Sequence, residues 1–63
     1  MKPKYRVGDR VIARDLPHEF DHYNGTPGTV VNALVHEGQP LYQVRMPDSG
    51  IIVNVPEANL ILA

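Results

Sequence analysis

Residues 18–22 read His-Glu-Phe-Asp-His, which places two histidines and a glutamate at the spacing that zinc proteases use. That chemistry needs a helix that brings both imidazoles to one face, a third ligand and a substrate cleft. A chain of 63 residues lacks the length for a long buried helix and a cleft together. We therefore expect no metal site and no cofactor, with at most weak metal binding by His18 and His22. The segment is interpreted as a polar surface loop pinned by Phe20 and Tyr23.

The other groups that could support catalysis are few and scattered. The chain has no cysteine, and its single serine, Ser49, stands among turn residues without a base at useful spacing. Glu19 and Asp21 stand two residues apart, which is more typical of a solvated acidic rim than of an acid/base pair. We do not expect one copy of this chain to be an enzyme. Catalysis would require self-assembly around a shared pore, or a larger partner.

The charge distribution is lopsided although the net charge is only -1. The first fourteen residues carry five basic side chains and one acidic side chain, or +4, and the remainder carries one basic and six acidic, or -5. A basic amino-terminal stretch can steer an acidic partner through its electric field. Nucleic-acid binding is the less favoured alternative, because only three Tyr and one Phe are present to stack on bases.

Six prolines and five glycines divide the chain into pieces that are too short for ordinary helices. Alternating or β-branched runs predict strands at residues 10–14, 28–35, 41–46, 50–56 and 60–63. Turn residues predict tight connections at residues 36–40 and 47–50, and a 3-10 turn at residues 56–59. The one long connection, residues 15–27, is a candidate functional loop.

Five short strands with one 3-10 turn before the last predict an all-β fold, a small SH3-like barrel that occupies residues 1–63 as a single domain. We expect one core, formed by Val11, Val30, Tyr42, Val44, Ile51, Val53, Val55 and Leu60. No run approaches the roughly 20 apolar residues of a membrane span, so we expect a soluble, cytoplasmic protein that does not bind a membrane.

Ile52 and Asn54 lie opposite the core face of their predicted strand. We expect Ile52, adjoined by Leu34 or Ile12, to form an apolar patch on the surface. Such a patch on a small barrel is often buried by self-association under closed symmetry. A homo-oligomer formed through residues 50–55 is therefore predicted.

Four segments carry a family resemblance: YRVGDRVIARDLP, YNGTPGTVV, QPLYQVRM and VPEANL. Together they resemble the SH3-like barrel at the carboxyl end of the nitrile hydratase β subunit. The matching residues are Gly8, Asp9 and Val11 in the first segment, Gly25, Gly28, Thr29 and Val30 in the second, and Pro40, Leu41, Tyr42, Val44 and Arg45 in the third. The catalytic metal of that family sits in the α subunit, so the resemblance implies an accessory or partner-binding barrel and not a hydratase.

Related barrels serve as small accessory subunits of photosystem I and of ferredoxin-thioredoxin reductase. Another related barrel is the homotetrameric type II dihydrofolate reductase, which looks similar to this chain from residues 8–11 through Gly50 to Pro56. The strand that lines the reductase pore reads Val-Gln-Ile-Tyr, whereas residues 52–55 of this chain read Ile-Val-Asn-Val. A shared-pore reductase is thus the enzymatic alternative, with the Gln and Tyr of its pore absent here.

The favoured interpretation is a non-enzymatic accessory barrel that binds a protein partner or a second copy of itself. Its expected contacts come from the basic stretch, from the aromatic residues of the long loop and from the exposed face of the strand at residues 50–56. The expected partner-binding residues are Lys4, Arg6, Arg14, Phe20, Tyr23, Ile52 and Asn54.

Overall fold

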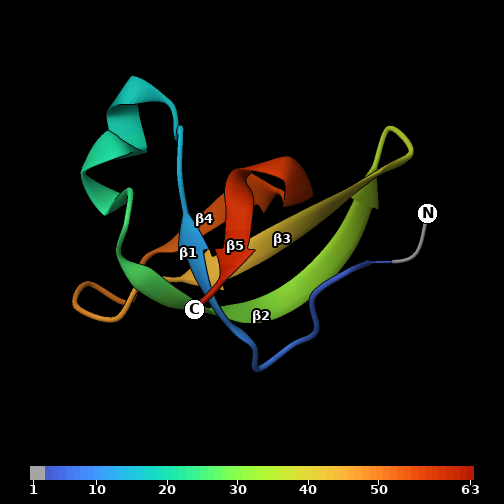
Figure 1. The fold of residues 1–63 in the computed structure, drawn as a ribbon, viewed down its shortest axis with the longest axis horizontal. Coiled ribbons are helices and arrows are strands. Elements are labelled where there is room, and N and C mark those ends of the chain that lie inside the picture. The colour runs from blue at the N-terminus through green and yellow to red at the C-terminus, as the bar shows by residue number, and fades with distance from the viewer. Residues whose placement is uncertain (1–2) are drawn as a thin grey trace.

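Five antiparallel strands form a single sheet in the computed structural model, which describes residues 3–63 (Figure 1). The strands are β1 (Arg10–Ala13), β2 (Pro27–His36), β3 (Gln39–Arg45), β4 (Ile52–Pro56) and β5 (Leu60–Leu62), and two 3-10 helices are η1 (His18–Tyr23) and η2 (Glu57–Asn59). The strand order is β4-β3-β2-β1-β5, with η2 placed directly before the last strand. The predicted all-β, SH3-like architecture is confirmed. Among the described residues, no helix is long and apolar enough to cross a membrane.

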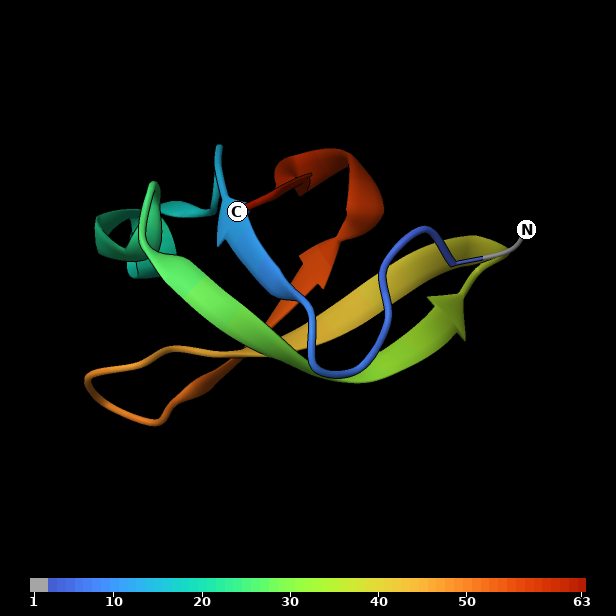
Figure 2. The ribbon, with the colours of Figure 1, turned by 60° about the horizontal axis from the view of Figure 1, so that its bottom comes forward.

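Strand β2 is shared between the two halves of the sheet. Residues Pro27 to Thr29 pair with β1, and residues Thr29 to His36 pair with β3. The register shifts between Val30 and Asn32, which leaves Val31 as an extra residue opposite β3. A bulge of this kind bends the strand and increases its twist, and both views show β2 strongly curved (Figures 1 and 2). This curvature rolls the sheet around one core.

The core fills the inside of the rolled sheet. Its buried side chains are Tyr5, Val11, Ala13, Leu16, Val30, Tyr42, Val44, Met46, Val53, Val55 and Leu60. The prediction was wrong for Ile51, whose side chain is 41% exposed. Ile51 precedes β4 and belongs to the turn, outside the strand whose alternation buries Val53 and Val55.

The tight connections follow the turn residues of the sequence. His36 pairs with Gln39, so Glu37 and Gly38 alone make the turn between β2 and β3, and both have positive φ, at 51° and 77°. Positive φ at both central residues is the geometry that suits the twist of a two-residue hairpin. Gly50, at φ 69°, occupies the left-handed conformation predicted for the turn between β3 and β4.

Candidate partner-binding groove

The two histidines of the zinc-like string do not share a face. They lie on η1, a 3-10 helix with about three residues per turn, so residues three apart eclipse and residues four apart do not. His18 accordingly meets Asp21, with Nδ1 3.3 Å from Oδ2. The His22 ring packs on Tyr23 instead, with 4.0 Å between ring centroids. Within residues 3–63, no three His, Cys, Asp or Glu side chains are grouped to hold a metal ion.

The aromatic residues of the long loop anchor it to the barrel. Phe20 and Tyr23 are half-buried and pack against the core. The Tyr23 hydroxyl lies 3.2 Å from the Ser49 hydroxyl, which ties η1 to the turn before β4. At the start of the loop, the Leu16 N–H donates to the Asn24 side-chain oxygen at 3.0 Å. Both aromatic side chains, which we predicted to contact a partner, therefore have an internal packing role.

The apolar patch predicted around Ile52 does not form as expected. Ile52 faces outward on β4 and is 47% exposed, but the residue beside it on β3 is Arg45. Leu34 pairs with Leu41, farther along the sheet, and Ile12 lies on β1 with β2 and β3 between it and β4. The register of the sheet, which the sequence alone does not reveal, separates these apolar side chains.

Asn54 also faces outward, whereas its neighbours Val53 and Val55 are buried in the core at 4% and 0% exposure. Two of the four positions aligned with the reductase pore strand therefore point into the barrel of this chain. The exposed face of β4 offers Ile52, Asn54 and Pro56 to any shared surface.

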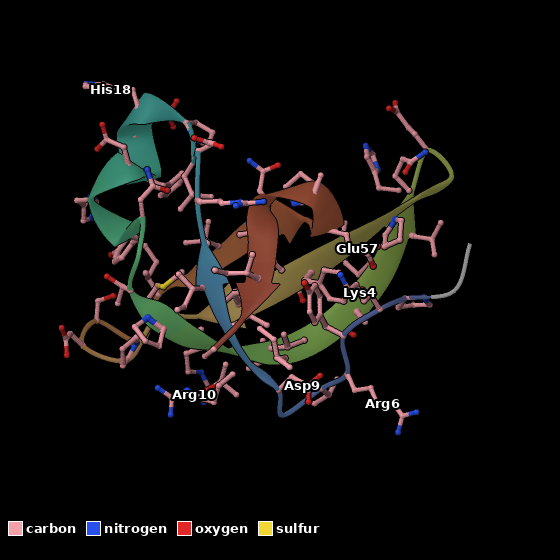
Figure 3. The ribbon with its side chains drawn as sticks, viewed as in Figure 1. Lys4, Arg6, Asp9, Arg10, His18 and Glu57 are labelled. Carbon is pink, nitrogen blue, oxygen red and sulfur yellow. The ribbon has the colours of Figure 1, made fainter. Side chains whose placement is uncertain are left out.

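An open groove of about 820 Å³ lies between the amino-terminal segment, η2 and β5. Its lining residues are Lys4, Tyr5, Asp9, Arg14, Gln39, Pro40, Pro56, Glu57, Ala58, Leu60, Ile61 and Leu62. The fold thus brings together Lys4 and Arg14, which stand ten positions apart in the basic stretch. Arg6 and Arg10 project outward from the barrel, and His18 lies at the far corner of the molecule (Figure 3). Lys2, part of the same basic stretch, lies outside the described residues.

A hydrogen-bond network fixes the amino-terminal wall of this groove. The Tyr42 hydroxyl accepts the N–H groups of Lys4 at 2.8 Å and Tyr5 at 3.0 Å, and donates to Glu57 Oε2 at 2.7 Å. The same Glu57 oxygen accepts the Lys4 N–H at 2.9 Å. The Tyr5 hydroxyl donates to the Leu60 carbonyl at 3.0 Å, and its ring packs edge-on against Tyr42. Lys4 and Glu57 accordingly lie side by side at the rim (Figure 3).

The network shifts the pKa of two groups in opposite directions. Burial raises the pKa of Tyr42 above 10.0, so the hydroxyl stays protonated and remains a donor. The hydrogen bond from Tyr42, followed by the one from the Lys4 N–H, holds the pKa of Glu57 below 4.5. Glu57 is therefore an ionised acceptor at neutral pH.

Replacing Glu57 by glutamine should reduce the acid sensitivity of the fold. A carboxyl group with a lowered folded-state pKa contributes stability that is complete above its unfolded value of 4.5 and is lost as pH falls through the lowered pKa. When the pH is lowered from neutral to below 4.5, we expect the Tm of Glu57→Gln to fall less than the Tm of the wild type. Circular dichroism measures both Tm values. Equal acid sensitivity in both proteins would contradict the assigned hydrogen bonds.

Sequence reasoning missed two of the residues that shape the groove. Tyr5 precedes the first strand, where no alternation marks it as buried, yet it is only 5% exposed. Glu57 was read as part of a 3-10 turn, and its contact with Lys4 joins residues 53 positions apart. The sequence held one indication of this network: Tyr42 is predicted on the buried face of its strand, and a buried tyrosine hydroxyl requires a hydrogen-bond partner.

The resemblance to the nitrile hydratase β subunit stays a prediction. The strand order and the position of η2 are consistent with an SH3-like barrel, and folds of this class carry many unrelated functions. Neither family models nor curated proteins nor solved structures gave a match to this chain.

Proposed function

We propose that this chain is a non-enzymatic, cytoplasmic accessory barrel that binds a protein partner. The groove takes up an extended segment of the partner that carries apolar and acidic side chains. The observation that carries this proposal is the combination, in one groove of the described chain, of an apolar lining and two cations, Lys4 and Arg14, that form no salt bridge. The predicted resemblance to accessory barrels agrees with this role.

The apolar lining offers both a rigid base and an exposed rim. Pro40, Leu60 and Tyr5 are buried, so their positions are fixed by the core beneath them. Leu62 is 63% exposed and Ile61 is 41% exposed at the carboxyl-terminal side. Exposed aliphatic side chains next to a fixed aromatic ring are typical of surfaces that bury apolar side chains of a partner.

The groove lining carries two cations, Lys4 and Arg14, and two carboxylates, Asp9 and Glu57, but both carboxylates already accept hydrogen bonds from the chain itself. Glu57 Oε2 accepts the Tyr42 hydroxyl and the Lys4 backbone N–H, and Asp9 Oδ2 accepts the Arg6 N–H at 3.0 Å. In the part of the chain that the structure describes, Lys4 and Arg14 form no ion pair with a carboxylate. A partner that brings carboxylates to this rim gains attraction and a faster encounter rate.

The titratable groups at the groove suit a structural role better than catalysis. A general acid or base works best when its pKa lies near the working pH. Tyr42 and Glu57 are shifted away from neutrality, upward and downward respectively. Both groups hold the backbone of residues 4 and 5 in place.

A reductase assembled around a shared pore makes a distinct prediction. Such an enzyme would show NADPH-dependent reduction of dihydrofolate above background. Because Val53 and Val55 are buried, we expect none. Turnover that survives dilution and depends on Asn54 would overturn the non-enzymatic proposal.

Peptide selection tests the groove directly. We expect a randomised peptide library, selected on the immobilised full chain, to yield sequences that combine Asp or Glu with apolar residues. The double variant Lys4→Glu/Arg14→Glu should weaken binding of the selected peptides about tenfold, because it replaces two attractive rim charges by repulsive ones.

The matched control is Arg10→Glu/Arg45→Glu, which changes the net charge equally but alters residues outside the groove. This control should retain most of the affinity. Equal losses in both double variants would show that overall charge, and not the groove, attracts the peptides. Selection of peptides without acidic residues would also contradict the proposal.

A further inference from the structure

Strand β4 has one free edge. It pairs with β3 on one side, and among the described residues no strand pairs with its other side. The Met46 N–H donates to the Ile51 carbonyl at 2.9 Å, so this carbonyl points toward the β3 side of the ladder. Hydrogen-bonded pairs alternate along an antiparallel ladder, so the next ones inward involve Val53 and Val55.

The backbone groups of Ile52 and Asn54 therefore point away from β3. Pro56 follows the same alternation, and its lack of an N–H fits a position whose nitrogen faces outward from the sheet. No hydrogen bond joins the N–H or carbonyl of Ile52 or Asn54 to any loop or turn of residues 3–63. The edge thus presents two donors and two acceptors, in alternation, over one short strand.

This edge lacks the usual protection against pairing. Exposed edge strands in soluble proteins commonly carry charged residues, a central proline or a bulge. Residues 50–56 carry no charge, β4 has no register shift, and its proline stands only at the end. Ile51, which precedes β4, is 41% exposed, and Ile52, its first residue, is 47% exposed.

The opposite edge of the sheet is protected. Strand β5 has only three residues. The Leu60 N–H already donates to the Glu57 carbonyl, and the Leu60 carbonyl accepts the Tyr5 hydroxyl. The two edges therefore differ in their capacity to accept another strand.

We propose that β4 pairs with β4 of a second copy of this chain, antiparallel across a two-fold axis that passes beside Val53. In this register Ile52 lies opposite the partner's Asn54, and Asn54 lies opposite the partner's Ile52. Each of these pairs exchanges both N–H···O bonds, so every free backbone group of Ile52 and Asn54 is satisfied.

The edge fits a copy of itself because a two-fold axis makes it self-complementary. The same two residues supply both donors and acceptors, and no charged side chain within β4 is brought opposite an identical charge. Val53 would face the partner's Val53, which extends the apolar inner face from one barrel to the next. The resulting sheet would run continuously through β3 and β4 of both copies.

Sedimentation equilibrium of the full chain tests the pairing. We expect a reversible dimer, of twice the 7.0 kDa of one chain, to appear as concentration rises through the micromolar range. Chemical synthesis of the chain with an N-methyl group on the Asn54 backbone removes one outward donor from each copy. This variant should raise the dimer Kd about tenfold or more, because two intermolecular hydrogen bonds are lost and the methyl group obstructs the edge.

The matched control is Asn54→Thr, which changes the side chain but keeps the backbone donor and should retain the dimer. Circular dichroism verifies that the N-methylated chain is folded, as expected for a nitrogen not bonded to β3. If that chain is unfolded, the assigned direction of the Asn54 N–H is wrong and the proposal fails. A monomer at every concentration, or a dimer Kd unchanged by N-methylation, would equally overturn it.

Discussion

Replacing Met46 by alanine is expected to lower the free energy of unfolding by ~2–5 kcal/mol. The side chain is only 1% exposed, directly after the end of β3. Its removal leaves a cavity that the surrounding strands fill only in part. Domains have about 5–15 kcal/mol of stability in total, and one of this size belongs at the low end. Urea denaturation followed by far-ultraviolet circular dichroism should therefore show a large shift in midpoint.

Ile51→Ala is the matched control for this truncation. The sequence pattern predicts Ile51 in the core, whereas the structure exposes 41% of it. We expect Ile51→Ala to cost less than about 1 kcal/mol, because a side chain that is 41% exposed loses less buried apolar surface on truncation and leaves no enclosed cavity. Equal costs for the two variants would show that Ile51 is buried and that the end of the barrel is packed differently.

Gly28→Ala is expected to destabilise the fold by roughly 3 kcal/mol, although the substitution adds one methyl group. A Cβ at this position would lie 2.6 Å from Val44 Cγ1 and 2.9 Å from the Arg45 carbonyl oxygen. Gly28 is buried where β2 crosses from β1 to β3, so neither strand can move apart freely. Thermal unfolding of the variant should show the loss as a lower Tm.

A double-mutant cycle with Val44→Ala identifies the cause of this loss. Removing the Val44 methyl groups relieves the shorter contact but leaves the one with the backbone oxygen. Gly28→Ala should therefore cost less in the Val44→Ala background than in the wild type. Strictly additive effects would mean that the close approach to Val44 is not the source of the instability.

The strands were predictable because each has a local signature. Alternation in residues 41–46 and 51–55 identifies the buried faces of β3 and β4, and the prediction holds for Tyr42 and Val53. Turn chemistry also marks the connections, as the left-handed Gly38 shows. These signals lie within a few residues of one another, so the sequence alone contains them.

The groove was only partly predictable because its parts are distant in the sequence. The basic stretch suggested Lys4 and Arg14, but the contacts that hold Lys4 are made to Tyr42 and Glu57. The predicted patch around Ile52 failed for the same reason. Strand register decides which outward side chains are neighbours, and the bulge at Val31 changes that register along β2.

The most direct test of the proposed function is an NMR titration of the isotope-labelled full chain with a selected acidic peptide. The groove proposal predicts that the largest amide shifts occur at Tyr5, Arg14, Ala58 and Leu62, and that these shifts shrink as salt is added. The outward face of β4 at Ile52 and the loop at His18 should change little. Saturable shifts centred on β4 or η1, with the groove unaffected, would contradict the proposal.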